Sequence, residues 1–170
     1  MASEAPARVK LPSNAEKVAG LGLALALFAS PVLAADPLTG IASVIDADTI
    51  ELHGTRIRLV GIDAPEGRQT CDLDGQPWRC GQAAALALAD HIEGKTLDCR
   101  GDDLDRYGRR LTVCYIGTED VNGWLVSEGW AMAYRRYSVA YVPQEDSARI
   151  GRRGIWAGTF QMPWDWRKAH

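Results

Sequence analysis

The stretch DADTIELHGTRIRLVGIDAPE, residues 46–66, carries the features that predict the fold. The segments TIEL and TRIRLVGI alternate in polarity and are rich in β-branched residues, a pattern typical of strands. Gly54 lies between them and supplies a turn, so the stretch predicts a β-hairpin. Carboxylates gather at the open ends of this hairpin, including Asp48 on the first strand and Asp63 after the second.

The geometry of this hairpin decides whether the two aspartates can act together. With Gly54 at the tip, Asp48 faces about Val60. Asp63 then lies three residues further along, roughly 10 Å at the rise of a strand. A flat ribbon would keep the carboxylates apart, so strong coiling or a bulge, for example at Gly61, is needed to join them. The alternative is a pair of solvated aspartates at a turn and a strand end, as charge patterning alone favours.

A second hairpin and several helices follow. Residues 82–94, QAAALALADHIEG, place apolar side chains such as Leu86 at helical spacing and end on a glycine. The segments 95–100 and 110–117, KTLDCR and RLTVCYIG, predict the second hairpin. Short helices are expected at 122–129, with Asn122 as its cap, and at 143–154, and irregular structure at 64–81 and 156–170.

Strands grouped first and helices interleaved later predict an α+β fold, a five-stranded oligonucleotide-binding (OB) fold β-barrel with about three helices. One domain is expected over residues 36–160, followed by a C-terminal tail over 161–170. Four of the six tryptophans lie at Trp130 or later. We expect them to pack the tail against the domain, because large aromatic side chains mostly serve cores.

The N-terminal residues 1–34 differ in composition from the rest. Basic residues precede an apolar run from Val18 to Phe28 that is followed by small residues, the pattern of a secretory signal peptide. A cut near Ala34 or Ala35 would release a secreted or periplasmic protein. The alternative is an uncleaved membrane anchor, because the apolar stretch, extended to Ala35, is just long enough to cross a bilayer.

The charge balance limits the class of partner. The chain has 19 basic and 22 acidic residues. The leader contains three of the basic and two of the acidic residues, so 16 and 20 remain without it, a net charge of −4. This balance argues against a protein that holds nucleic acid by bulk charge. An enzyme acting on nucleic acid would need local basic groups and a cation to offset its own carboxylates.

All four cysteines follow the leader, and an even number in an exported protein predicts disulfides. Three pairings are open, but spacing favours one. Cys71 and Cys80 flank a loop with glycine and proline, and Cys99 and Cys114 flank the tip of the second hairpin. Reduced buried thiols or a metal site are the alternatives, although no CxxC pair and no histidine at ligand spacing supports zinc.

Charged residues of the first hairpin and of the segment DRYGRRL provide the parts for phosphodiester hydrolysis. Hard divalent cations prefer oxygen ligands such as the carboxylates of Asp48 and Asp63. The guanidinium forks of Arg58 and Arg109 can each hold two phosphate oxygens and neutralise charge that builds on them. Glu66, whose approach is fixed by the preceding proline, suits a base that takes a proton from water.

The motifs DADTIEL, RLVGIDAPE, DRYGRRL and VNGWLVSEGWA, in this order, resemble the staphylococcal nuclease (thermonuclease) family over about residues 41–156. The resemblance implies an OB-fold barrel and a Ca²⁺-dependent endonuclease, which hydrolyses DNA and RNA to 3′-phosphate products. It also implies single-stranded or locally melted substrates, and a monomer with no obligate protein partner.

By the same resemblance, Asp48 and Asp63 correspond to metal-binding aspartates. The residue after Asp63, Ala64, corresponds to a position whose backbone carbonyl is directed at the metal. Glu66 corresponds to the catalytic glutamate that acts as a general base through water. The two phosphate-binding arginines of the family correspond to Arg58 and Arg109.

The resemblance also implies contacts with substrate. Arg106 falls where a basic residue contacts a nucleotide phosphate, and Tyr134 and Tyr137 match tyrosines that contact a terminal nucleotide. The chain departs from the family at Ala47, where some members have glycine, and in the cysteine-bearing loop 66–81, which replaces a lysine-rich loop. The different loop affects the expectation for substrate binding and sequence preference, but not that for catalysis.

Two other functions stay open. One is a non-catalytic module of the same fold that binds nucleic acid or an envelope partner. Such a module would be expected to lack Glu66 or one of the arginines, and this chain has them all. The other is an envelope protein that serves polysaccharide or cell-surface processes, for which the acidic net charge is the only support.

Overall fold

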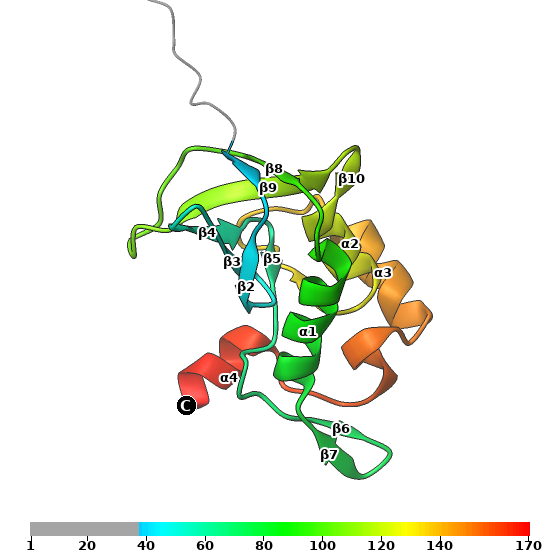
Figure 1. Cartoon of the computed structure of the whole chain (residues 1–170). Helices are drawn as coiled ribbons and strands as arrows, with labels where there is room; N and C mark the ends of the chain where they lie inside the picture. Colours follow the sequence, from blue (N-terminus) through cyan, green and yellow to red (C-terminus); the bar gives the residue numbers. More distant parts are fainter. Residues whose placement is uncertain (1–37) are drawn as a thin grey trace, which may run out of the picture. The chain divides into compact units, whose positions relative to one another are not determined.

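The structure, a computed structural model, describes residues 38–170 (Figure 1). The predicted signal peptide or anchor over residues 1–34 lies outside the described residues. The strands are β1 (Leu38–Gly40), β2 (Ser43–Asp46), β3 (Thr49–Leu52), β4 (Thr55–Leu59), β5 (Ile62–Asp63), β6 (Cys71–Leu73), β7 (Gln76–Trp78), β8 (Leu97–Arg100), β9 (Arg110–Ile116), β10 (Glu119–Asp120) and β11 (Met132–Ala133). The helices are α1 (Cys80–Ile92), α2 (Val121–Ser127), α3 (Val142–Ile150), the 3₁₀ helix η1 (Gly154–Ala157) and α4 (Pro163–Ala169).

The main sheet is mixed and has the strand order β1-β8-β9-β4-β3-β2, with β10 also paired to β9. Its pairings are antiparallel except that of β4 with β9, which is parallel. Two small sheets, β11-β5 and β6-β7, lie outside it. The main sheet curls into a half-barrel, with α1 packed against β2 and α2 against β9 (Figure 1). The predicted α+β OB-fold class is therefore confirmed, with four α-helices over residues 38–170 where about three were expected.

The core lies between the curled sheet and the helices. Strand residues such as Ile50 and Ile57, paired across β3 and β4, are buried in it. On α1 the buried residues include Ala84, Leu88 and Ile92, spaced four residues apart, whereas Leu86 is 56% exposed. The helix was predicted correctly, but its buried face only in part, since the predicted face included Ile92 as well as Leu86. The alternating leucines and alanines of this segment leave several faces apolar.

Both predicted disulfides are confirmed, Cys71–Cys80 and Cys99–Cys114. The second joins residues that lie directly opposite each other on β8 and β9. The loop around the first was expected to be irregular, but it contains the β6–β7 hairpin. Its turn is made by Asp74 and Gly75, both with positive φ, which is the geometry that a two-residue hairpin turn requires.

A second apolar cluster surrounds the Cys71–Cys80 disulfide and holds the C-terminal segment. Met132 and Ile155 are buried in it, and a shell of five aromatic residues and one methionine packs around them. The shell consists of Trp78, Trp130, Trp156, Phe160, Met162 and Trp164. Packing of the late tryptophans was predicted and holds for three of them, while Trp166 stacks on His170 instead. The expectation of an irregular tail was wrong, because this packing supports η1 and α4.

Helix α2 begins at a different cap from the one predicted. The carboxylate of Asp120 accepts a hydrogen bond from Gly123 N at 3.0 Å. Asn122, the predicted cap, is fully buried and joins β9 to the turn after β4. Its amide donates to Val60 O at 3.0 Å, and its Oδ1 accepts from Cys114 N at 3.2 Å. Its polar group is therefore satisfied inside the core, as a buried amide must be.

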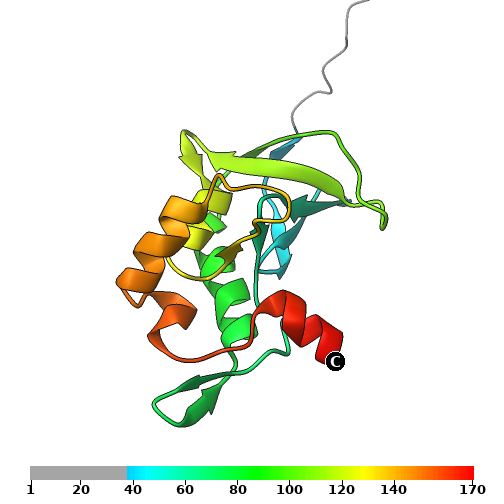
Figure 2. The same cartoon turned by 180° about the vertical axis from the view of Figure 1, so that it is seen from behind.

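Figure 2 shows α4 apart from the α2–α3 pair, at the end of the chain. Over residues 38–170, no helix has both the length and the apolar character needed to cross a membrane.

Candidate functional site

The β3–β4 hairpin positions the first half of the site. Its turn consists of His53 and Gly54, with φ of +51° and +77°, so the tip has two residues and not one. Thr49 therefore faces Arg58, and Leu59 N donates to the carbonyl of Asp48 at 2.9 Å. Asp48 is therefore opposite Leu59 and not, as predicted, opposite Val60. The difference of one residue arises because the turn has two residues instead of one.

The chain brings Asp63 back to Asp48 by a turn and not by a bulge in β4. Strand β4 ends at Leu59, and the chain turns at Gly61, whose φ is +77°. Strand β5 then runs beside β11, away from the β3–β4 ladder. As a result, Ala64 N donates to Asp48 Oδ2 at 3.1 Å. Gly61 was the expected position, but the feature there is a turn and not a bulge, and the register irregularity lies in β2, between Val44 and Asp46.

Arg58 joins the two aspartates. Its guanidinium forms an ion pair with Asp48 and a second one with Asp63 Oδ1 at 2.9 Å. The Asp63 side chain is completely buried, and that of Arg58 is 15% exposed. The two acidic groups that a flat ribbon would hold apart are thus in reach of one cationic group.

Further carboxylates add to the negative charge of Asp48 and Asp63. Asp46 lies in the same pocket, where burial and then the neighbouring Asp48 and Glu66 raise the pKa of its carboxyl group. Burial also raises the pKa of Asp63, and its hydrogen bonds to arginine only partly offset this effect. A carboxylate in such surroundings favours a nearby positive charge.

Glu66 is fixed through its backbone. Its N–H donates to Gln69 Oε1 at 3.3 Å, and Gly81 of α1 packs directly against its carbonyl. A Cβ at position 81 would lie 1.7 Å from Glu66 O, so only glycine fits this contact. The Glu66 side chain is 32% exposed and lines the pocket.

The segment before β9 forms the second wall. Asp105 holds Arg109 by a hydrogen bond from Nε at 2.8 Å and by one from its backbone N at 3.0 Å. Burial works against the charged form of Asp105, but hydrogen bonds from Arg109 and Tyr107 prevail and lower its pKa. Tyr107 is 72% exposed, with the Arg106 and Arg109 guanidinium groups at 5.3 and 5.6 Å from its ring centroid. Arginines and an aromatic face are thereby presented together.

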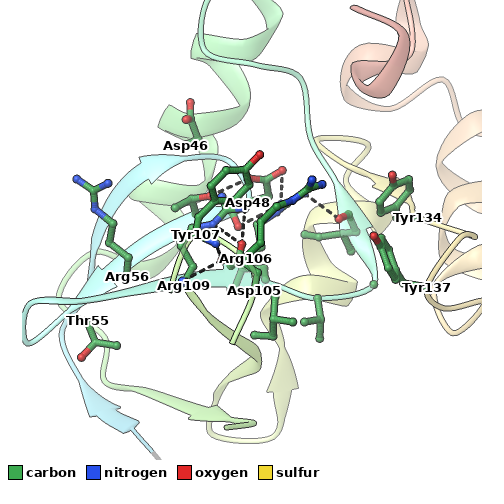
Figure 3. Close-up of a pocket in the computed structure, with 18 of the residues that line it drawn as sticks. Asp46, Asp48, Thr55, Arg56, Asp105, Arg106, Tyr107, Arg109, Tyr134 and Tyr137 are labelled. Carbon is green, nitrogen blue, oxygen red and sulfur yellow. Dashed lines mark hydrogen bonds and ion pairs between the residues drawn. The ribbon is translucent and has the colours of Figure 1, made fainter. Parts of the chain in front are cut away.

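The third wall consists of Tyr134 and Tyr137, whose rings meet edge to face at 5.1 Å. Figure 3 shows them on one side of the pocket, Asp46 and Arg56 on the other, and the residues of the segment before β9 between them. The pocket measures about 1240 Å³, which is more than most small-molecule sites.

The structure brings most of the predicted site residues to this one pocket. Its lining includes Asp48, Arg58, Glu66, Arg106, Arg109, Tyr134 and Tyr137. Asp63 and Ala64 are buried and do not line it, but each contacts Asp48 or Arg58. Ala47 has no positive φ, so alanine suits the position where relatives of the family carry glycine.

Three site residues were missed by sequence reasoning. Asp46 and Tyr107 belong to the quoted motifs and could have been found there. Arg167 had no signal, because it lies in α4, in the segment expected to be a tail. It forms ion pairs with Asp63 and Glu66, both at 2.7 Å.

The carboxylates fit a hard divalent cation. Asp48 and Asp63 are both held by Arg58 and so offer oxygen donors close together, the ligands that such cations prefer. Over residues 38–170, however, no group of three or more histidine, cysteine, aspartate or glutamate side chains is arranged to hold a metal ion. Any cation would therefore share its shell with water or substrate.

Residues 56–158 match the family model described as staphylococcal nuclease homologue. The chain belongs to the staphylococcal nuclease family. The "Succinoglycan biosynthesis protein ExoI" of Rhizobium meliloti (strain 1021) is 36% identical over 156 residues, 89% of this chain and 82% of that protein. An "Uncharacterized endonuclease" of Escherichia coli O157:H7 is 36% identical over 153 residues, 85% of this chain and 94% of that protein.

A third relative, the "Micrococcal nuclease" of Shigella flexneri, is 33% identical over 147 residues, 76% of this chain and 79% of that protein. The matched range includes Arg58, Glu66 and Arg109 but ends before α4. Membership of the staphylococcal nuclease family makes the chain a hydrolase of the nuclease class, with nucleic acid as its substrate.

Proposed function

We propose that the protein is an exported, Ca²⁺-dependent endonuclease that hydrolyses single-stranded or locally melted DNA and RNA and leaves 3′-phosphate ends. The observation that supports it most is one pocket that holds two arginines and a glutamate beside paired aspartates. Arg58, Arg109 and Glu66 all line this pocket.

In this proposal each charged residue has one task. Arg58 and Arg109 bind the phosphate oxygens and neutralise the charge that develops on them in the transition state. Asp105 holds the Arg109 guanidinium in place, so that the arginine does not have to be ordered during the reaction. Glu66 takes a proton from the attacking water, whose oxygen forms a new bond to phosphorus as the bond from phosphorus to the 5′ oxygen breaks. The 5′ oxygen takes a proton from solvent and leaves as a hydroxyl, and the phosphate stays on the 3′ oxygen.

Asp48 and Asp63, with the backbone of Ala64, would hold the cation. When bound, Ca²⁺ would polarise a phosphate oxygen and the water. The aromatic rings of Tyr107, Tyr134 and Tyr137 would stack on bases, which suits substrates whose bases are unpaired.

Export is proposed from two features that agree with each other. The leader has the pattern of a signal peptide, and disulfides such as Cys71–Cys80 and Cys99–Cys114 persist in oxidising compartments. Whether the mature protein is periplasmic, secreted or anchored depends on cleavage of the leader. We further propose that it acts as a monomer without an obligate protein partner.

The test is hydrolysis of a short single-stranded DNA by the purified protein, with Ca²⁺ or with chelator. We expect Ca²⁺-dependent cleavage, with 3′-phosphate ends seen by mass spectrometry of the products. Glu66→Gln should lower kcat by about 10²–10⁴-fold, the usual contribution of a general base. Glu128→Ala is the matched control, because Glu128 is exposed at the end of α2 and does not line the pocket.

The second candidate is a non-catalytic module that binds nucleic acid or an envelope partner. The name of the succinoglycan biosynthesis relative favours it, as does the ion pair that engages Glu66 with Arg167. In that case the protein would bind single-stranded DNA without cleaving it, and Glu66→Gln would leave binding unchanged.

A further inference from the structure

Arg167 occupies the acidic centre of the site from the C-terminal side. Its guanidinium donates through Nη2 to Asp63 Oδ2 at 2.7 Å and through Nη1 to Asp63 Oδ1 at 3.1 Å. The same Nη1 donates to Glu66 Oε1 at 2.7 Å. Both oxygens of Asp63 are therefore engaged by a fork, the strongest geometry for a pair of arginine and carboxylate.

Packing positions this arginine. Helix α4 begins at Pro163, which is buried, and Trp164 stacks on Tyr134 with ring centroids 5.7 Å apart. Just before the helix, the carbonyl of Gln161 accepts a hydrogen bond at 2.6 Å from the fully buried Gln69. Gln69 also contacts the backbone of Glu66, so the segment that carries Arg167 is tied to the residue that Arg167 binds.

A guanidinium and a divalent cation cannot both use these oxygens fully. Asp63 is completely buried and has no further lone pairs facing solvent. A metal ion at Asp63 would also lie within a few ångströms of the Arg167 charge, where like charges repel strongly. Arg58 donates to Asp63 Oδ1, whereas Oδ2 accepts from Arg167, so Arg167 is the group that blocks Oδ2.

We propose that Arg167 holds the place of the divalent cation in the cation-free protein, and that the cation must displace it from Asp63 and Glu66. This inference rests on the proposed function in one respect, namely that Asp63 is a cation ligand. Cation binding is then coupled to α4: as Arg167 leaves, Glu66 is freed to act as a base and the contact of Trp164 with Tyr134 is loosened.

The test is the affinity for Ca²⁺, measured by titration calorimetry on the full chain without nucleic acid. Arg167→Gln should bind Ca²⁺ about ten- to a hundredfold more tightly than the wild type, since one charged hydrogen-bonding competitor is removed. Arg167→Lys keeps the charge but loses the fork, and should lie in between. Lys168→Gln is the control: it removes one positive charge from the same helix, but within residues 38–170 the ion pair of Lys168 is with Asp165 and not with the site.

A second measurement follows α4 itself. Hydrogen exchange of residues 163–169 should increase when Ca²⁺ binds to the wild type, whereas Arg167→Gln should exchange fast with or without Ca²⁺. Thermal melting of each variant establishes that it folds.

The outcomes separate the two proposals. Equal Ca²⁺ affinity in the wild type and Arg167→Gln, with α4 exchange unaffected by Ca²⁺, would overturn the displacement and leave the proposed cation site intact. If Arg167→Gln instead weakens nucleotide binding at unchanged Ca²⁺ affinity, Arg167 is a phosphate ligand and the displacement is again wrong. If none of the proteins binds Ca²⁺, the cation of the proposed function fails as well.

Discussion

The pocket has two junctions between acidic and basic residues, and they differ in how far apart their partners lie in the chain. On the barrel side, Arg58 joins Asp48 and Asp63, which are ten and five residues away. On the C-terminal side, Arg167 joins Asp63 and Glu66, which are 104 and 101 residues away. Both junctions share the carboxylate of Asp63.

The difference shows two ways of building one site. The barrel junction follows from local geometry, because hairpin register and the turn at Gly61 bring the aspartates to Arg58. The C-terminal junction follows from packing, because α4 reaches the site through an aromatic cluster around the Cys71–Cys80 disulfide. We expect the first to be part of the rigid fold and the second to be separable from it.

Removing the barrel arginine should have the largest effect. Arg58→Ala should lower kcat on single-stranded DNA by about 10²–10³-fold, the scale of one lost preorganised donor. It should also lower the free energy of unfolding by about 2–4 kcal/mol, because it leaves buried acidic groups less compensated. Rates of DNA cleavage and urea unfolding without Ca²⁺ measure the two effects. Added Ca²⁺ should restore part of the stability.

Arg109→Ala is the comparison for that variant. Its kcat should fall by a similar factor. Within residues 38–170, Arg109 forms its ion pair with the part-buried Asp105 and also donates to Thr49 Oγ1 at 3.4 Å. Because no completely buried carboxylate loses its partner, the free energy of unfolding should fall by only about 1 kcal/mol. Equal losses of stability in the two variants would contradict the distinction, and near-normal rates in both would contradict their assignment to the phosphate.

The two disulfides provide a second test of separability. The double variant Cys99→Ala/Cys114→Ala removes the disulfide between residues 15 positions apart. Its free energy of unfolding should fall by about 3 kcal/mol, because the unfolded chain is no longer cross-linked. Cys71→Ala/Cys80→Ala concerns a separation of only 9 residues and should lose slightly less. Only the second double variant should speed hydrogen exchange in α4, because Cys71 and Cys80 belong to the cluster that holds it. The idea of a separate C-terminal support is wrong if both variants affect α4 alike.

The smallest effect concerns pH. Burial, followed by repulsion from Asp48 and Glu66, raises the pKa of Asp46 above its ordinary value of 3.8. The folded protein therefore binds this proton more tightly than the unfolded chain, and stability falls as pH rises through the folded pKa. In Asp46→Asn the decline from about pH 4 upward should be shallower, although Asp63, whose pKa is also raised, still contributes.

Thermal melts of both proteins without Ca²⁺ measure this slope. Parallel curves for the wild type and Asp46→Asn would mean that the pKa of Asp46 is not raised in the folded protein.

Much of the fold could be predicted because its signals are local. The β3–β4 hairpin has alternating residues and a glycine turn, and α1 has a continuous run of helix-forming residues. The same information predicted only part of the buried face of α1, which depends on which side meets β2. It also missed α4, because seven residues with two tryptophans have a weak helical signal and are stabilised by tertiary packing.

The candidate site divides in the same way. Asp48, Arg58, Asp63, Glu66 and Arg109 lie in short motifs, so their types and spacing alone pointed to them. The register at Asp48 was misplaced by one residue, because the choice between a one- and a two-residue tip depends on backbone conformations at His53 and Gly54.

The sequence by itself determined the OB-fold class, both disulfides and the residues of the barrel side, because each depends on neighbours within a few tens of residues. Only the tertiary structure decided that Arg167 reaches Asp63 and Glu66, since no local pattern encodes a contact across a hundred residues. That contact exists because packing of the buried Pro163 and the partly buried Trp164 fixes the position of α4. The packing of neighbouring residues places such a helix and so decides which groups its charged side chain contacts.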